Sequence, residues 1–296
     1  MEGPPSTFRP HVFLPLAAFL FLAILIRASF VYPPEPAPAS ASLPPPPPPR
    51  VLTPAPEIIA EAYFVKILGE EQQILKQREE KSLSPASITK LLTVVIASER
   101  LPPGAILVLT EAAKALEEKL VPAPAGEAFL RDDMIRLALI GSFNDAAAAL
   151  LEAVEPDPTR ARELLNQTAA RIGMAHSHFE NSTGLDAEGH ETTAEDLARL
   201  AEYIARHHPD LLEMTRIREA TVSSLSGQEY AITNTNELLS EFPALLGGKT
   251  GLTDKAKGTL LLWYPAGEKT AIIVILGSED RFGDGRKLIG WIEENF

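Results

Sequence analysis

The chain has 296 residues, of which 45% are hydrophobic and 23% are charged, so it is long and apolar enough for one large domain or two small ones. The absence of cysteine excludes disulfide bonds, thiolate metal sites, a cysteine nucleophile and a lipid anchor on an N-terminal cysteine. The net charge of -13 repels phosphate backbones, so nucleic acid is not an expected partner.

The first 56 residues differ in composition from the rest of the chain. After an N-terminal stub at 1–11, residues 12–32 are almost entirely apolar and predict a transmembrane anchor, because about 20 apolar residues cross a bilayer. A signal peptide is the alternative, although small residues suited to cleavage, at 37–42, lie far from the apolar run. Residues 33–56 are half proline and predict a semi-rigid linker.

Residues 57–296 are expected to form the folded domain, with strand patterns at both of its ends. An apolar strand at 62–68 is followed by a returning strand at 73–77. Near the C-terminus, the segments 259–264 and 270–276 are nearly continuous apolar runs joined by a short turn. Such runs predict a central antiparallel hairpin that is buried on both faces.

Between these strands, the region from about 86 to 205 shows helical periodicity or a helix-forming composition. A last helix is expected at 285–294. These patterns favour an α/β (α+β) fold: a central antiparallel sheet takes strands from both chain ends, carries helices on its faces and has a mostly helical subdomain inserted. The expected internal helices are 91–99, 132–140, 145–154, 159–172 and 194–206.

The first of three short motifs is Ser87-Ile88-Thr89-Lys90, which follows Pro85. Proline suits a helix start, so Ser87 falls in the first turn and Lys90 lies one turn later on the same face. A lysine amine activates a serine hydroxyl when burial or a second cation lowers its pKa. The alternative is a helix-capping serine with a solvated lysine, and this motif alone is near chance frequency.

The second motif is Ser142-Phe143-Asn144, which precedes an alanine-rich helix. Its residues suit ordinary helix capping. In a functional interpretation, the Ser142 hydroxyl relays a proton to a leaving group, and the Asn144 amide binds a substrate peptide group.

The third motif is Lys249-Thr250-Gly251, preceded by two further glycines. A turn between strands is one interpretation. In the other, the glycines let a substrate backbone approach closely while Lys249 and Thr250 hold a carboxylate. A phosphate-binding loop is disfavoured, because strands rather than a helix follow the motif.

The three motifs together match the pattern S-x-x-K, S-x-N and K-T-G. From about residue 60 to 293, the chain resembles the serine-type D-Ala-D-Ala carboxypeptidases, the low-molecular-mass penicillin-binding proteins. The similar segments are Pro85-Ala86-Ser87-Ile88-Thr89-Lys90, Ser142-Phe143-Asn144-Asp145-Ala146-Ala147, Asn181-Ser182-Thr183-Gly184-Leu185-Asp186, Gly189-His190, Thr193-Ala194-Glu195-Asp196-Leu197-Ala198, Asn234-Thr235-Asn236 and Lys249-Thr250-Gly251-Leu252-Thr253.

The resemblance implies a role for each site residue. Ser87 attacks the penultimate D-Ala carbonyl and Lys90 is the base. The backbone N–H groups of Ser87 and Leu252 form the oxyanion hole. The remaining implied roles are proton transfer to the departing D-alanine by Ser142, binding of the substrate backbone by Asn144, and binding of the terminal carboxylate by Lys249 and Thr250 beside Gly251.

The resemblance also implies the partners and the location. Peptidoglycan stem peptides are the expected substrates, β-lactams the expected inhibitors, and no cofactor or metal is required. The catalytic domain is expected outside the cytoplasm of a bacterium, held to the membrane by the N-terminal helix. That helix would replace the C-terminal anchor of many family members, which this sequence lacks together with their C-terminal β domain.

Three alternatives stay open. A D,D-endopeptidase that cuts peptidoglycan cross-links uses the same residues. A serine β-lactamase of class A needs a deacylating glutamate, and the nearest such string, at Glu163, is one residue short. A non-catalytic wall-binding module would be expected to lack Ser87 or Lys90. One departure from the family, Ala256-Lys257-Gly258, puts the local strand register in doubt.

Overall fold

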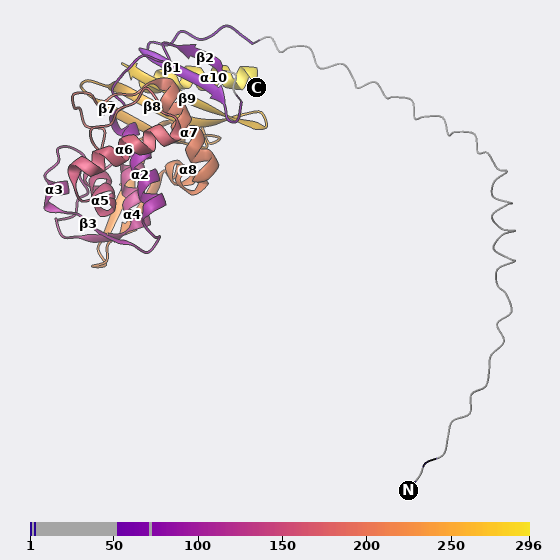
Figure 1. Cartoon of the computed structure of the whole chain (residues 1–296). Helices are drawn as coiled ribbons and strands as arrows, with labels where there is room; N and C mark the ends of the chain where they lie inside the picture. Colours follow the sequence, from indigo (N-terminus) through magenta and orange to yellow (C-terminus); the bar gives the residue numbers. More distant parts are fainter. Residues whose placement is uncertain (2, 4–51, 71–72) are drawn as a thin grey trace. The chain divides into compact units, whose positions relative to one another are not determined.

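The computed structural model describes residues 1, 3, 52–70 and 73–296 (Figure 1). The predicted anchor at 12–32 and most of the predicted linker at 33–56 lie outside the described residues. Within the described part of the chain, no helix combines the length and the apolar character that a membrane crossing requires. Residues from Leu52 to Phe296 form one compact unit.

A five-stranded antiparallel sheet, in the order β2-β1-β9-β8-β7, is the centre of this unit. As predicted, it takes strands from both chain ends, which pair directly where β1 meets β9. The edge strand β7 was not predicted as a strand, because its glycines and its lysine read as a turn. The strands are β1 (Ala62–Ile67), β2 (Gln73–Gln77), β7 (Gly247–Thr253), β8 (Lys257–Ala266) and β9 (Lys269–Ser278).

The nearly continuous apolar sequences of β8 and β9 follow from burial on both faces of the sheet. Alternate residues belong to two separate cores: Leu261 and Trp263 pack with the helical subdomain, whereas Leu260 and Leu262 pack with the C-terminal helix α10 (Arg281–Asn295). Successive side chains of a strand point to opposite faces, so each strand supplies both cores. The sequence left the strand register around Ala256-Lys257-Gly258 in doubt. In the structure, a tight turn pairs Thr253 with Lys257, and the pairing of β8 with β9 shifts its register between Gly258 and Leu260.

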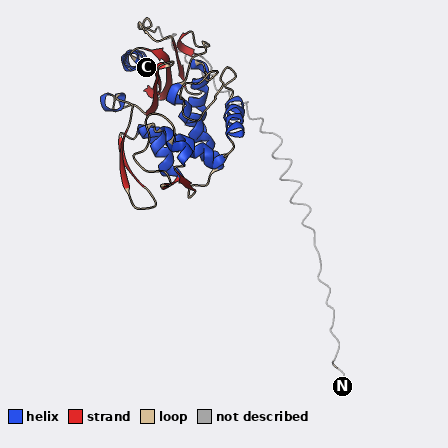
Figure 2. Ribbon diagram, turned by 90° about the vertical axis from the view of Figure 1, so that its left-hand side faces the viewer, coloured by secondary structure: helices blue, strands red, loops and turns tan. Residues whose placement is uncertain are grey.

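The inserted subdomain is mostly helical, and Figure 2 shows its helices gathered beside the sheet. Four predicted helices are confirmed within α2, α5, α6 and α7. The predicted helix 132–140 is an α-helix that widens into a π-helix, η3. The elements are η2 (Ala86–Ile88), α2 (Thr89–Arg100), α3 (Glu111–Lys114), α4 (Arg131–Arg136), η3 (Leu137–Gly141), α5 (Asn144–Val154), α6 (Pro158–Ile172), α7 (Ala194–His207), α8 (Pro209–Arg216) and α9 (Leu238–Glu241).

Two small ribbons in this region were not predicted. One pairs β3 (Ile106–Val108) with β4 (Ala128–Leu130), and the other pairs β5 (Glu219–Ser223) with β6 (Glu229–Thr233). The strands of the first ribbon have three residues each, which is too little alternation to be recognised in a sequence. The last helix also begins four residues before the expected 285, because the Asp280 side chain accepts a hydrogen bond from the Gly283 N–H and caps it.

Candidate active site

Ser87 and Lys90 lie together where η2 passes into α2. The Lys90 Nζ is 2.7 Å from the Ser87 Oγ, as the spacing of three residues on a helix predicted. The same nitrogen donates to the Asn144 Oδ1 at 2.7 Å and to the Thr183 carbonyl at 2.7 Å. An uncharged amine has two N–H groups and one lone pair. Since the two carbonyl oxygens take the N–H groups, the lone pair is left for the Ser87 hydroxyl.

The environment of Lys90 favours this uncharged form. Its side chain is fully buried, and burial lowers its pKa to about 7, with a smaller contribution from the positive charge of Lys119. The carboxylate of Asp145 opposes the shift. At neutral pH, a large fraction of Lys90 is therefore able to accept a proton.

Ser142 and Lys249 form a second pair opposite the first. Ser142 follows the π-helix and has a left-handed backbone with φ of 59°. The Lys249 Nζ donates to the Ser142 Oγ at 2.7 Å and to the Thr250 carbonyl at 3.0 Å. Burial holds the pKa of Lys249 well below its ordinary value, and the positive charges of Lys90, Lys119 and Arg281 lower it further.

Asn144 connects Lys90 to a neighbouring loop. While its carbonyl oxygen accepts from Lys90, its amide nitrogen donates to the backbone carbonyls of Glu117 and Glu118, both at 3.0 Å. Both N–H groups of this side chain are thus in use within the protein. Its predicted role in binding a substrate backbone stays a prediction.

Two glycines let other segments approach the nucleophile. A Cβ placed on Gly184 would lie 1.8 Å from the Ala86 carbonyl oxygen, and one on Gly251 would lie 2.8 Å from the Ser87 backbone nitrogen. The prediction that the glycines of the third motif make room for a substrate stays a prediction. Gly251 makes room for the protein's own Ala86 and Ser87, because β7 packs directly against η2.

These groups surround a cleft of about 390 Å³. Of the predicted site residues, Lys90 and Lys249 are buried, and their polar ends reach cleft-lining hydroxyls. The others line the cleft: Ser87, Ser142, Asn144, Thr250, Gly251 and Leu252.

The cleft also contains residues that the sequence did not single out. Lys119 and Arg281 line it together with Glu118 and Glu237, so the cleft presents groups of both charges. Thr235 lines it as well, with its Oγ1 2.6 Å from the Thr250 Oγ1. Arg281 escaped notice because the last helix was expected to begin after it. The resemblance had included Thr235, within Asn234-Thr235-Asn236, but had assigned it no role.

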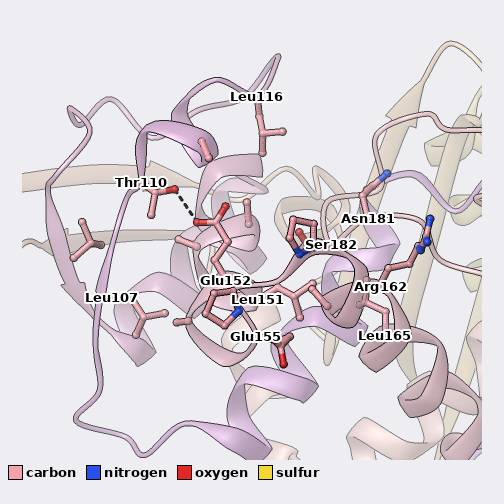
Figure 3. Close-up of a pocket in the computed structure, with 18 of the residues that line it drawn as sticks. Leu107, Thr110, Leu116, Leu151, Glu152, Glu155, Arg162, Leu165, Asn181 and Ser182 are labelled. Atoms are coloured by element: carbon pink, nitrogen blue, oxygen red, sulfur yellow. Dashed lines mark hydrogen bonds between the residues drawn. The ribbon is translucent and has the colours of Figure 1, made fainter.

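A separate apolar pocket of about 660 Å³ lies within the helical subdomain (Figure 3). Leu107, Leu151 and Leu165 line it, and Glu152 on its wall accepts a hydrogen bond from Thr110 at 2.7 Å. None of the predicted site residues lines this pocket. Glu163, the glutamate considered for deacylation, is exposed on α6 and does not line the active-site cleft.

Metal ligands are not gathered in this part of the protein. Across residues 52–70 and 73–296, no group of three or more histidine, aspartate and glutamate side chains is arranged to hold a metal ion. The reactive groups of the cleft are the hydroxyls and amines described above. This set of residues matches the motifs that the penicillin-binding proteins share with the class A β-lactamases.

Comparison with known proteins identifies the family. A family model described as D-alanyl-D-alanine carboxypeptidase matches residues 50–280, and the chain belongs to this family. The chain is 28% identical over 210 residues to D-alanyl-D-alanine carboxypeptidase DacF of Bacillus subtilis, covering 69% of this chain and 54% of that protein. The chain therefore spans about half the length of that relative.

Two further similarities cover more of the other protein. The chain is 29% identical over 216 residues to a D-alanyl-D-alanine endopeptidase of Pseudomonas aeruginosa, covering 70% of this chain and 69% of that protein. Among solved structures, a D-alanyl-D-alanine carboxypeptidase of Mycobacterium tuberculosis matches with a TM-score of 0.74 and 26% identity, covering 81% of this chain and 93% of that one.

Proposed function

We propose that this protein is a serine D-Ala-D-Ala carboxypeptidase that removes the terminal D-alanine from peptidoglycan pentapeptides through an acyl-enzyme on Ser87. The observation that carries the proposal is the buried Lys90 amine, 2.7 Å from the Ser87 hydroxyl with its pKa lowered to about 7. A serine is a nucleophile only when a neighbouring base takes its proton. Lys90 is such a base.

In the first half-reaction, the Ser87 proton moves to the Lys90 Nζ as the Oγ attacks the carbonyl carbon of the penultimate D-alanine. The backbone N–H groups of Ser87 and Leu252 stabilise the negative charge on the carbonyl oxygen. Support for this pairing is the close approach of Gly251 to the Ser87 nitrogen. The C–N bond then breaks, and the departing D-alanine amine receives, through the Ser142 hydroxyl, the proton that Lys90 took from Ser87; Lys249 contacts that hydroxyl. Water later hydrolyses the ester.

The positive groups of the cleft suit the terminal carboxylate of the substrate. Lys249 and Thr250 are proposed to hold it, and we add Arg281 from its place in the cleft. Among the described residues, the buried Nε of Arg281 has no hydrogen-bond partner. A carboxylate brought into the cleft would raise the pKa of Lys249 and favour its charged form.

The inhibitors are proposed from the chemistry of the cleft, and the location is proposed from the sequence before the catalytic domain. β-Lactams present a carboxylate and a reactive carbonyl, so they are expected to acylate Ser87 in place of a stem peptide. The apolar run at 12–32 and the proline-rich linker at 33–56 support a membrane-anchored protein with its catalytic domain on the wall side of the membrane.

Release of D-alanine from a stem pentapeptide tests the proposed activity. We expect purified residues 52–296 to release D-alanine from a peptide ending in D-Ala-D-Ala, measured with a D-amino acid oxidase assay. The matched control is the same peptide ending in D-Ala-L-Ala, which is expected to stay intact. Rapid hydrolysis of penicillin without release of D-alanine would contradict the proposal and indicate a β-lactamase instead.

Replacement of Arg281 by glutamine is expected to weaken substrate binding. Loss of one charge-assisted contact to the terminal carboxylate raises KM for the pentapeptide by about 10- to 100-fold and leaves kcat nearly unchanged. The control is Arg286→Gln on the same helix, because Arg286 pairs with Glu241 and does not line the cleft. An unchanged KM in Arg281→Gln would remove Arg281 from the carboxylate site.

An endopeptidase activity is the second candidate, favoured by the similarity to the endopeptidase of Pseudomonas aeruginosa. It requires the same acyl-enzyme but accepts a leaving group larger than D-alanine. Incubation with cross-linked peptide dimers, followed by chromatography, separates the two activities. Appearance of monomers would show that the protein also has endopeptidase activity.

A further inference from the structure

Residues 181–190, here called the cradle segment, contact the nucleophile region at several points. The Thr183 carbonyl accepts from Lys90, and Gly184 packs on the Ala86 carbonyl. The Asp186 carboxylate accepts from Ser84 at 3.3 Å and from Thr253 at 2.7 Å. The segment ends at a buried histidine, His190.

The hydrogen bonds of His190 determine its tautomer. Its Nδ1 accepts from the backbone N–H of Glu180 at 3.0 Å, so the ring proton is on Nε2. The Nε2 lies 2.9 Å from the Thr89 Oγ1, to which it donates. Burial lowers the pKa of His190 to about 4, so the ring is neutral at neutral pH and keeps this arrangement.

Thr89 connects His190 to the residue that precedes the nucleophile. Its hydroxyl donates to the Ala86 carbonyl at 2.8 Å. Ala86 has a left-handed backbone with φ of 47°, which L-residues with a Cβ seldom adopt unless their surroundings hold them there. Ala86 directly precedes Ser87, so a change in the Ala86 backbone moves the Ser87 Oγ relative to Lys90.

We propose that His190 is a positioning residue for Ser87: through the Thr89 hydroxyl, its imidazole holds the strained Ala86 carbonyl and so sets the distance from the Ser87 Oγ to the Lys90 Nζ. This inference rests on the proposed acylation of Ser87. His190 touches no reacting atom and acts only through Thr89 and Ala86. The left-handed Ala86, Gly184 and His190 then act together to hold Ser87 in position.

The test uses the full chain in detergent and two matched pairs of variants. His190→Gln places an amide donor near the position of Nε2, whereas His190→Asn keeps only an acceptor near Nδ1. Thr89→Ser keeps the hydroxyl, whereas Thr89→Val removes it at nearly constant volume. For each variant, stopped-flow measurement with a fluorescent penicillin gives the first-order acylation rate constant and the dissociation constant of the noncovalent complex, and a thermal melt reports folding.

A loss of positioning slows acylation without weakening noncovalent binding. We expect His190→Asn and Thr89→Val each to lower the acylation rate constant by about 10- to 100-fold at an unchanged dissociation constant. We expect His190→Gln and Thr89→Ser to stay within about threefold of the wild type. The double variant that combines Thr89→Val with His190→Asn is expected to be no slower than the slower single variant, because both changes break one chain of contacts.

Several outcomes would overturn the inference. It is wrong if His190→Asn and Thr89→Val acylate at the wild-type rate, if His190→Gln is as slow as His190→Asn, or if the two single effects multiply in the double variant. Should His190→Asn fail to fold, the Thr89 pair decides alone. An unreactive wild type would contradict the proposed function and this inference together, whereas a reactive wild type with unaffected variants would contradict this inference only.

Discussion

Replacement of Ser87 by alanine is expected to abolish covalent labelling by a fluorescent penicillin and to lower D-alanine release by about 10⁴-fold or more, because Ser87 is the residue proposed to form the acyl-enzyme. Gel fluorescence after denaturation measures the labelling, since only a covalent adduct survives it. The melting temperature should change little, because the Ser87 hydroxyl makes one hydrogen bond, to Lys90.

The control for this substitution is Ser84→Ala. Ser84 lies in the same segment, but its hydroxyl donates to Asp186 and does not line the cleft. Labelling of Ser84→Ala should persist. Labelling that survives in Ser87→Ala would show that the adduct forms on another residue, and the proposed mechanism would then be wrong.

The acylation rate is expected to rise with pH through about 7 and to level off above it. The reactive form of Lys90 is the uncharged amine, and its pKa is lowered to about 7. Below that pH, the ammonium form predominates and the rate falls about tenfold per pH unit. Lys90→Met is expected to lower the rate by about 10³-fold and to remove this pH dependence.

Lys119 provides a sharper form of this test. Its positive charge contributes to the lowered pKa of Lys90, so Lys119→Ala should move the pH profile to higher pH. Lys269→Ala makes the same change in net charge at a site paired with Glu70, outside the cleft, and should leave the profile in place. A profile that does not change between wild type and Lys119→Ala, or that persists in Lys90→Met, would show that another group titrates.

Much of the fold was predictable because its signals are local. The buried hairpin of β8 and β9 reads directly from uninterrupted apolar runs, and the helices α5, α6 and α7 from composition and period. The edge strand β7 was missed for a physical reason. Its glycines are adaptations to close neighbours in the folded protein, such as Ser87 at Gly251, and they hide the strand pattern.

The sequence by itself determined which groups are predicted to carry the chemistry. Ser87 lies in η2 and Lys90 three residues later in the first turn of α2, so their contact is a local consequence of helical geometry. Ser142 and Lys249 could be named from their motifs, but 107 residues separate them, and only folding brings them to 2.7 Å.

The tertiary structure decided the pKa values and the neighbours of those groups. Burial and neighbouring charges set the lowered pKa of Lys90, and these depend on packing between distant segments. The same packing brings Arg281 from the last helix into the cleft and joins His190 to Ala86 through Thr89. Motifs predict residue types at fixed spacings, whereas distances, burial and electric fields across a cleft arise only when the chain folds.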